Sequence, residues 1–185
     1  MTALTAANQL TLLRIMLVPA FVILVIYGYL GWALIVFATA GLTDALDGVI
    51  ARRSGQKSTL GAWLDPMADK LLALSTFVVL TVPGLGLTNR LPVWLTVLII
   101  SRDIVIVLTV AIVNLAVGPR TFRPSIYGKA ATAIYMTTAV VAMFFNYRGY
   151  HSVIVDAFIY ASLAITLVSG FHYIRHASRI LETPA

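Results

Sequence analysis

The sequence predicts an all-α integral membrane protein, and three observations support this fold class. Apolar residues occupy 60% of the 185 positions and charged residues only 11%, with a mean hydropathy of +0.94. Soluble domains are typically ~45–50% apolar and ~25% charged. About six segments approach the roughly 20 apolar residues that a helix needs to cross a bilayer. The sequence has no cysteine, which excludes a disulfide scaffold and thiolate metal ligands.

The expected spans follow one another with short breaks, so we expect a single membrane domain over residues 1–185. The six spans cover residues 10–29, 30–50, 61–82, 92–117, 129–146 and 153–173. Glycine, proline and polar residues occupy the breaks between them, as turns require. The sequence has no internal repeat, which disfavours the duplicated halves that are common in secondary transporters.

Basic residues near the span ends predict the orientation. One set of loops carries Arg52, Arg53, Lys57, Arg120, Arg123, Lys129, Arg175 and Arg179. The opposite set carries only Arg90 and Arg148, so the rich set and both termini should face the cytoplasm. The first thirteen residues contain no Lys or Arg, so we expect neither a signal peptide nor a transit peptide, which favours a bacterial plasma membrane. This topology accounts for the net charge of +6 and the pI near 9.9, and we expect no nucleic-acid partner.

Four of the seven acidic residues fall inside apolar segments, where a charge is costly. Asp44 and Asp47 lie late in the second span, and Asp65 and Asp69 lie early in the third. Residues three or four apart share a helix face, and consecutive spans run antiparallel, so the four carboxylates should meet near the cytoplasmic surface. Burying four charges would cost on the order of 10 kcal/mol unless they line a wet cavity and bind cations.

The ligand chemistry of this cluster indicates hard cations. Carboxylate oxygens without cysteine or a nearby histidine favour Mg²⁺, Mn²⁺ or Ca²⁺ over zinc. Four carboxylates suit two cations that clamp the attacking and leaving oxygens in phosphoryl transfer. The alternative interpretation is four interfacial aspartates paired with Arg52, Arg53 or Lys70.

Residues 44–69 fit the pattern D-x2-D-G-x2-A-R-x8-G-x3-D-x3-D at every fixed position and with the spacing intact. This pattern closely resembles the signature of the CDP-alcohol phosphotransferase family, and the resemblance covers essentially the whole chain. It implies a six-helix bundle with a polar cavity open to the cytoplasmic side, two divalent cations, Mg²⁺ or Mn²⁺, and a homodimer. The implied reaction is attack by an alcohol on the lipid-side phosphorus of CDP-diacylglycerol, with release of CMP.

The resemblance also implies roles for individual residues. Asp44, Asp47 and Asp65 would be metal ligands, and Asp69 would be both a ligand and the general base. The resemblance also implies that the CDP-lipid is bound by Gly48, Ala51, Arg52, Gly61, Ser58 and Asn8. The small residues would let cytidine diphosphate lie against the helix backbones, or they would serve helix packing. The arginine would fork onto phosphate oxygens, or it would be a positive-inside anchor.

Sequence features outside the signature indicate which alcohol is the acceptor. Residues 8–19 resemble the opening of both phosphatidylglycerophosphate synthases and CMP-forming cardiolipin synthases. The run Ser101-Arg102-Asp103 and the run Arg123-Pro124-Ser125 look more like the cardiolipin synthases. This favours phosphatidylglycerol as the acceptor, with glycerol 3-phosphate as the alternative.

A cationic set provides candidates for binding the phosphate that both acceptors carry. Its members are Arg102, Arg120, Arg123 and Lys129. The alternatives are an internal pair of Arg102 with Asp103 and a lipid-headgroup role for the loop arginines. The competing function class is a cation transporter or channel, but an ion pathway should distribute carboxylates through the membrane instead of gathering them at one surface.

Overall fold

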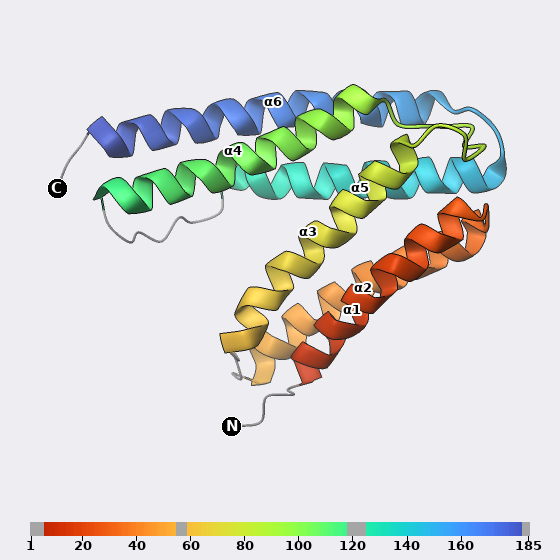
Figure 1. Ribbon diagram of the computed structural model, residues 1–185, viewed down its shortest axis with the longest axis horizontal. Coiled ribbons are helices and arrows are strands. Elements are labelled where there is room, and N and C mark those ends of the chain that lie inside the picture. The colour runs from red at the N-terminus through yellow and green to blue at the C-terminus, as the bar shows by residue number, and fades with distance from the viewer. Residues whose placement is uncertain (1–5, 55–58, 118–124, 183–185) are drawn as a thin grey trace. The chain divides into compact units, whose positions relative to one another are not determined.

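The computed structural model describes residues 6–54, 59–117 and 125–182, and within them the regular secondary structure is entirely helical (Figure 1). The described part contains six helices: α1 Ala6–Ile26, α2 Leu30–Ser54, α3 Thr59–Thr81, α4 Val93–Val117, α5 Ile126–Arg148 and α6 Val153–Glu182. Side chains at 6–8, 44–54, 59–66, 114, 116–117, 176–177 and 179–182 lie outside this description. Each expected span corresponds to one helix, so the prediction of an all-α fold is confirmed.

All six helices are long enough for a bilayer, and four described segments are also apolar enough. At about 1.5 Å per residue, helices of 21 to 30 residues are roughly 30–45 Å long, against a hydrocarbon core of ~30 Å. Four described segments meet both conditions: Gln9–Ile26, Val93–Val113, Ile126–Arg148 and Val153–Arg175. In α2 the described side chains end at Thr43, so the described apolar stretch Leu30–Thr43 is shorter than a span. The chain is thus a multi-pass membrane protein with four of the six expected spans recognisable by length and composition.

A glycine ends α1 three residues before the expected boundary. Gly28 has a φ of 77°, a left-handed conformation that favours glycine. Its N–H donates to the carbonyl of Val25 at 3.0 Å, and the N–H of Tyr29 donates to the carbonyl of Leu24 at 2.8 Å. This pair of bonds is a Schellman motif, which caps the last carbonyls of the helix and lets α2 begin at Leu30.

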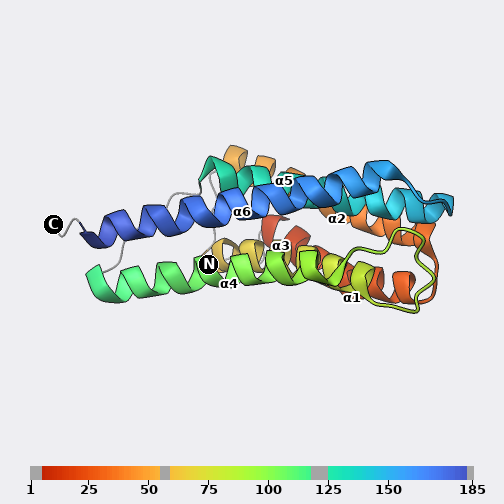
Figure 2. The ribbon, with the colours of Figure 1, turned by 90° about the horizontal axis from the view of Figure 1, so that it is seen from above.

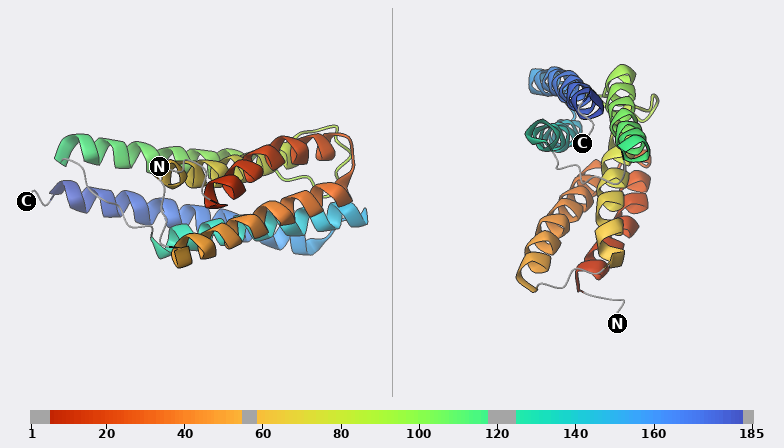
Figure 3. Two further views of the ribbon diagram at one scale, coloured as in Figure 1. Left: turned by 90° about the horizontal axis from the view of Figure 1, so that it is seen from below. Right: turned by 90° about the vertical axis from the view of Figure 1, so that its left-hand side faces the viewer.

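The described residues form two compact units, and each is considered by itself. The first comprises Met1–Arg90 with Ala142–His151, and the second comprises Leu91–Val141 with Ser152–Ala185. In the first unit, α1 packs against both α2 and α3; α3 runs in the same direction as α1, and α2 runs in the opposite direction (Figures 1 and 3).

One face of α1 is the core of the first unit. Its buried residues are Thr11, Arg14, Val18, Phe21 and Val25, which recur at the three- and four-residue spacing of a single helix face. Phe21 meets Phe37 of α2, with ring centroids 5.7 Å apart. The arginine on this face is therefore enclosed by protein.

Hydrogen bonds of two asparagine side chains stabilise the first unit at the end farthest from the aspartate motif. The backbone N–H of Asn89 donates to Oδ1 of Asn146 at 2.7 Å, and Nδ2 of Asn146 donates to the carbonyl of Asn89 at 3.2 Å. Nδ2 of Asn89 also donates to the carbonyl of Tyr150 at 2.9 Å. These bonds join the segment after α3 to the end of α5.

Hydrogen bonds between hydroxyl groups along one face of α6 stabilise the second unit. α4 packs against α6 (Figure 2), and α5 bonds to α6 through two hydroxyl pairs. The phenol oxygen of Tyr135 lies 2.6 Å from Oγ1 of Thr166, and Oγ1 of Thr138 lies 2.8 Å from Oγ of Ser162. Hydrogen bonds of this kind join helices in lipid, where the hydrophobic effect gives no drive for helix association.

Replacing Tyr135 by Phe should weaken the second unit. The change removes the hydroxyl that bonds to Thr166 and is expected to lower the free energy of unfolding by about 0.5–1.5 kcal/mol. Denaturant unfolding in detergent micelles measures this difference. Tyr160→Phe is the matched control because that phenol is 65% exposed, and an equal loss in both variants would contradict the prediction.

Candidate active site

The acidic motif occupies the end of α2 and the start of α3, and both helices pack against α1. Asp44 lies ten positions before the last residue of α2, and Asp69 lies ten positions after the first residue of α3. Both are therefore about 15 Å from the connected helix ends, while Asp47 and Asp65 are about 10 Å from them. Asp44 and Asp69 therefore lie at one level along the two helices, and Asp47 and Asp65 lie at another.

Of the expected metal ligands, Asp69 is the one whose side chain the structure describes. The side chains of Asp44, Asp47 and Asp65 lie outside the described residues. The same holds for the nucleotide candidates Asn8, Gly48, Ala51, Arg52 and Gly61, and Ser58 is outside entirely. Among the described side chains, no group of three or more metal-binding residues occurs.

Asp69 pairs with Arg14 of α1, an interaction that the sequence did not predict. Nη1 of the arginine contacts Oδ1 of the aspartate. The arginine side chain is 0% exposed, whereas the aspartate side chain is 44% exposed and remains accessible to a ligand. A signal was available, since Arg14 is the single charged residue of an otherwise apolar or uncharged helix and such residues usually serve function.

The donor set fits divalent cations. The motif provides carboxylate oxygens, which are the ligands that Mg²⁺ and Mn²⁺ take in proteins. The accessible carboxylate of Asp69 sits on a helix face next to the buried Ala68, with three further aspartates at matched helical levels. An arginine already offsets one of the four negative charges.

The candidate acceptor residues belong to the second unit. Arg102 is largely buried, with Nη1 donating to Oδ1 of Asp103 at 2.8 Å and Nη2 donating to Oγ of Ser169. The contact with Asp103 is the one that the alternative interpretation expected, and the contact with Ser169 was not predicted. Lys129 is exposed near the start of α5.

Two glycines lie close to the side chain of Arg102, and one of its guanidinium nitrogens makes no hydrogen bond to the described residues. A Cβ at Gly128 would lie 3.5 Å from Nη2, and a Cβ at Gly170 would lie 3.9 Å from Cγ. Nε is buried and has no hydrogen-bond partner among the described residues. The other two members of the cationic set, Arg120 and Arg123, lie outside the described residues.

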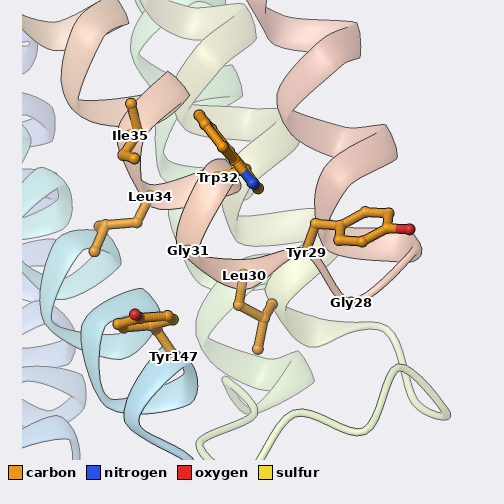
Figure 4. Close-up of a pocket in the computed structure, with 8 residues that line it drawn as sticks. All are labelled: Gly28, Tyr29, Leu30, Gly31, Trp32, Leu34, Ile35 and Tyr147. Atoms are coloured by element: carbon orange, nitrogen blue, oxygen red, sulfur yellow. The ribbon is translucent and has the colours of Figure 1, made fainter.

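A shallow pocket in the first unit lies away from the motif. It has a volume of about 570 Å³ and is lined by Gly28, Tyr29, Leu30, Gly31, Trp32, Leu34, Ile35 and Tyr147 (Figure 4). The lining is apolar and aromatic, and it surrounds the first turns of α2, whereas the aspartates occupy the last turns. The pocket is therefore not the candidate active site.

The chain is similar to proteins of known class along almost its whole length. The sequence model of the CDP-alcohol phosphatidyltransferase family matches residues 4–168. A Mycobacterium tuberculosis (strain ATCC 25618 / H37Rv) protein named probable phosphatidylglycerophosphate synthase is 34% identical over 181 residues, which are 94% of this chain and 81% of the relative. The human cardiolipin synthase (CMP-forming) is 35% identical over 198 residues, covering 96% of this chain and 64% of the relative. The cardiolipin synthase (CMP-forming) of Streptomyces coelicolor is 39% identical over 135 residues, covering 70% and 60%.

Proposed function

The chain belongs to the CDP-alcohol phosphatidyltransferase family, and from this premise we propose that it transfers a phosphatidyl group from CDP-diacylglycerol to phosphatidylglycerol and releases CMP. Family membership makes it a phosphatidyltransferase of phospholipid synthesis. The observation that carries the proposed transfer chemistry, though not the choice of acceptor, is the complete signature at residues 44–69, at matched levels of α2 and α3. The product would be cardiolipin.

The proposed chemistry is a single displacement at phosphorus. The acceptor hydroxyl oxygen forms a bond to the lipid-side phosphorus, the bond from that phosphorus to the bridging oxygen breaks, and CMP leaves with the bond electrons. Asp69 accepts the hydroxyl proton as general base. Asp44, Asp47, Asp65 and Asp69 would hold two divalent cations, Mg²⁺ or Mn²⁺. Bound there, the cations would neutralise the pyrophosphate and the leaving oxygen.

The remaining signature residues would bind the CDP-lipid. Gly48, Ala51 and Gly61 would leave room for the nucleotide against the helix backbones, and Arg52 would fork onto phosphate oxygens. Ser58 and Asn8 would add nucleotide contacts. The diacyl tails remain in the bilayer while the head group reaches the polar region at the helix ends.

The acceptor is proposed from the sequence outside the signature. Relatives of similar identity are named for both reactions, so identity alone does not choose between phosphatidylglycerol and glycerol 3-phosphate. The run Ser101-Arg102-Asp103 favours phosphatidylglycerol. The acceptor phosphate would be bound by Arg102, Arg120, Arg123 and Lys129, and the buried Nε of Arg102 supports a role of that residue beyond its pair with Asp103.

We further propose that all six helices cross the membrane and that residues 1–185 act as one domain, of which the family model matches residues 4–168. The motif would face the cytoplasm of a bacterium, at its plasma membrane, and the protein would be a homodimer. A cation channel or transporter is the competing function. The grouping of the acidic positions at one pair of helix ends, instead of along the spans, supports the enzyme.

The acceptor can be identified with the purified protein in nanodiscs containing CDP-diacylglycerol and Mg²⁺ or Mn²⁺. Phosphatidylglycerol and glycerol 3-phosphate are offered separately, CMP release is followed, and the lipid product is identified by mass. We expect cardiolipin, formed only with phosphatidylglycerol. Phosphatidylglycerophosphate would instead identify glycerol 3-phosphate as the acceptor, and the absence of CMP release with any alcohol would favour the ion pathway.

Replacing Asp69 by Asn should abolish most turnover. The amide cannot accept the hydroxyl proton, so CMP release is expected to fall by about 10²-fold or more while the protein still folds and inserts. Asp156→Asn on α6 is the matched control and should retain turnover, because Asp156 lies outside the motif. Retained turnover in the Asp69 variant would remove this residue from the role of base.

The six-span topology can be tested by cysteine labelling, because the natural sequence contains no cysteine. Thr88→Cys, in the segment between α3 and α4, should react with a membrane-impermeant maleimide on intact cells. Ser54→Cys, at the end of α2, should react only after the membrane is permeabilised. Labelling of the second variant from outside would mean that α2 and α3 do not cross the bilayer.

A further inference from the structure

A fully buried arginine lies at the edge of the acidic motif without belonging to the signature. Arg14 is 0% exposed, and it lies on the same face of α1 as the buried Thr11 and Val18. Helix α3 packs on α1 and buries Ala68 and Leu72, the residues that flank Asp69 on neighbouring positions of that helix. The guanidinium therefore approaches the aspartate from the protein interior, and its Nη1 contacts Oδ1.

We propose that Arg14 is a positioning residue for the phosphatidyl transfer: it orients the carboxylate of Asp69 and supplies permanent positive charge to the site. This inference rests on the proposed function. The orientation follows from geometry, because a contact from the buried side to Oδ1 restricts how the carboxylate turns while 44% of the side chain stays exposed toward a ligand. A proton acceptor must be held within hydrogen-bond reach of the attacking hydroxyl.

The charge balance of the loaded site supports the same role. Four aspartates offset two divalent cations, which leaves the two negative charges of the substrate pyrophosphate to be balanced by protein. Motif helix α2 carries Arg52 and Arg53, and Arg14 of α1 is the arginine whose contact with the motif the structure describes. A guanidinium remains charged when buried and keeps a planar set of donors, so arginine suits this position better than lysine.

Two substitutions separate positioning from a merely structural role. Arg14→Gln removes the charge, and Arg14→Lys keeps the charge but loses the planar fork. Two quantities are measured on folded, purified protein: Mn²⁺ binding without substrate, by electron paramagnetic resonance, and kcat for CMP release. Arg90→Gln is the matched control, because Arg90 is an exposed arginine of the same unit outside the motif.

The expected signature is a divergence between metal binding and turnover. Arg14→Gln should bind Mn²⁺ at least as tightly as the wild type, because a like charge has been removed from beside the ligands. Its kcat should fall roughly tenfold to a hundredfold, because Asp69 is no longer held in place. Arg14→Lys should bind Mn²⁺ like the wild type and recover part of kcat, and Arg90→Gln should match the wild type in both measurements.

Two results would overturn the proposal. An unchanged kcat in folded Arg14→Gln would show that Asp69 needs no positioning by this arginine. A parallel loss of Mn²⁺ binding and kcat in both Arg14 variants would assign the arginine to the scaffold alone. A wild type that releases no CMP would instead count against the proposed function, so the two failures are distinguishable.

Discussion

The ion pair of Arg14 with Asp69 is the interaction that links the packing of the first unit to the acidic motif. A charge on a helix that crosses lipid has no water to solvate it, so it must find its partner within the protein. Arg14 is fully buried on the face of α1 that packs against its neighbours, and α3 supplies the carboxylate. Satisfying this charge requires α1 and α3 to lie side by side at one register, and that register sets the level at which the acidic motif begins.

The two helices that carry the acidic motif both pack against α1. Each of them carries two aspartates of the motif, and a charge inside a span must be solvated by protein or by a wet cavity. Helices of this kind depend on a neighbour for their place in a membrane. α1 is that neighbour for both, since it packs against α2 and α3 and offers a continuous buried face from Thr11 to Val25.

The second unit pairs buried polar side chains through neutral hydrogen bonds along α6 and through one local ion pair. Ser162, Thr166 and Ser169 share one face of that helix and bond to side chains of α5 and α4. Each such bond contributes modestly in a membrane, typically below ~2 kcal/mol, but an unsatisfied hydroxyl or guanidinium would be far more costly in lipid. The outward faces of these helices remain apolar, as contact with lipid requires.

The sequence by itself determined the fold class, the approximate bounds of all six helices and the family. These properties follow from local information: apolar runs, turn residues such as Gly28, and a signature confined to residues 44–69. The pair of Arg102 with Asp103 was also predictable because its members are adjacent in the chain. Tertiary structure alone decided that Arg14 meets Asp69, 55 residues away, and that Arg102 meets Ser169, 67 residues away. Helical periodicity shows which residues share a face, but only the packing of one helix on another selects which faces meet.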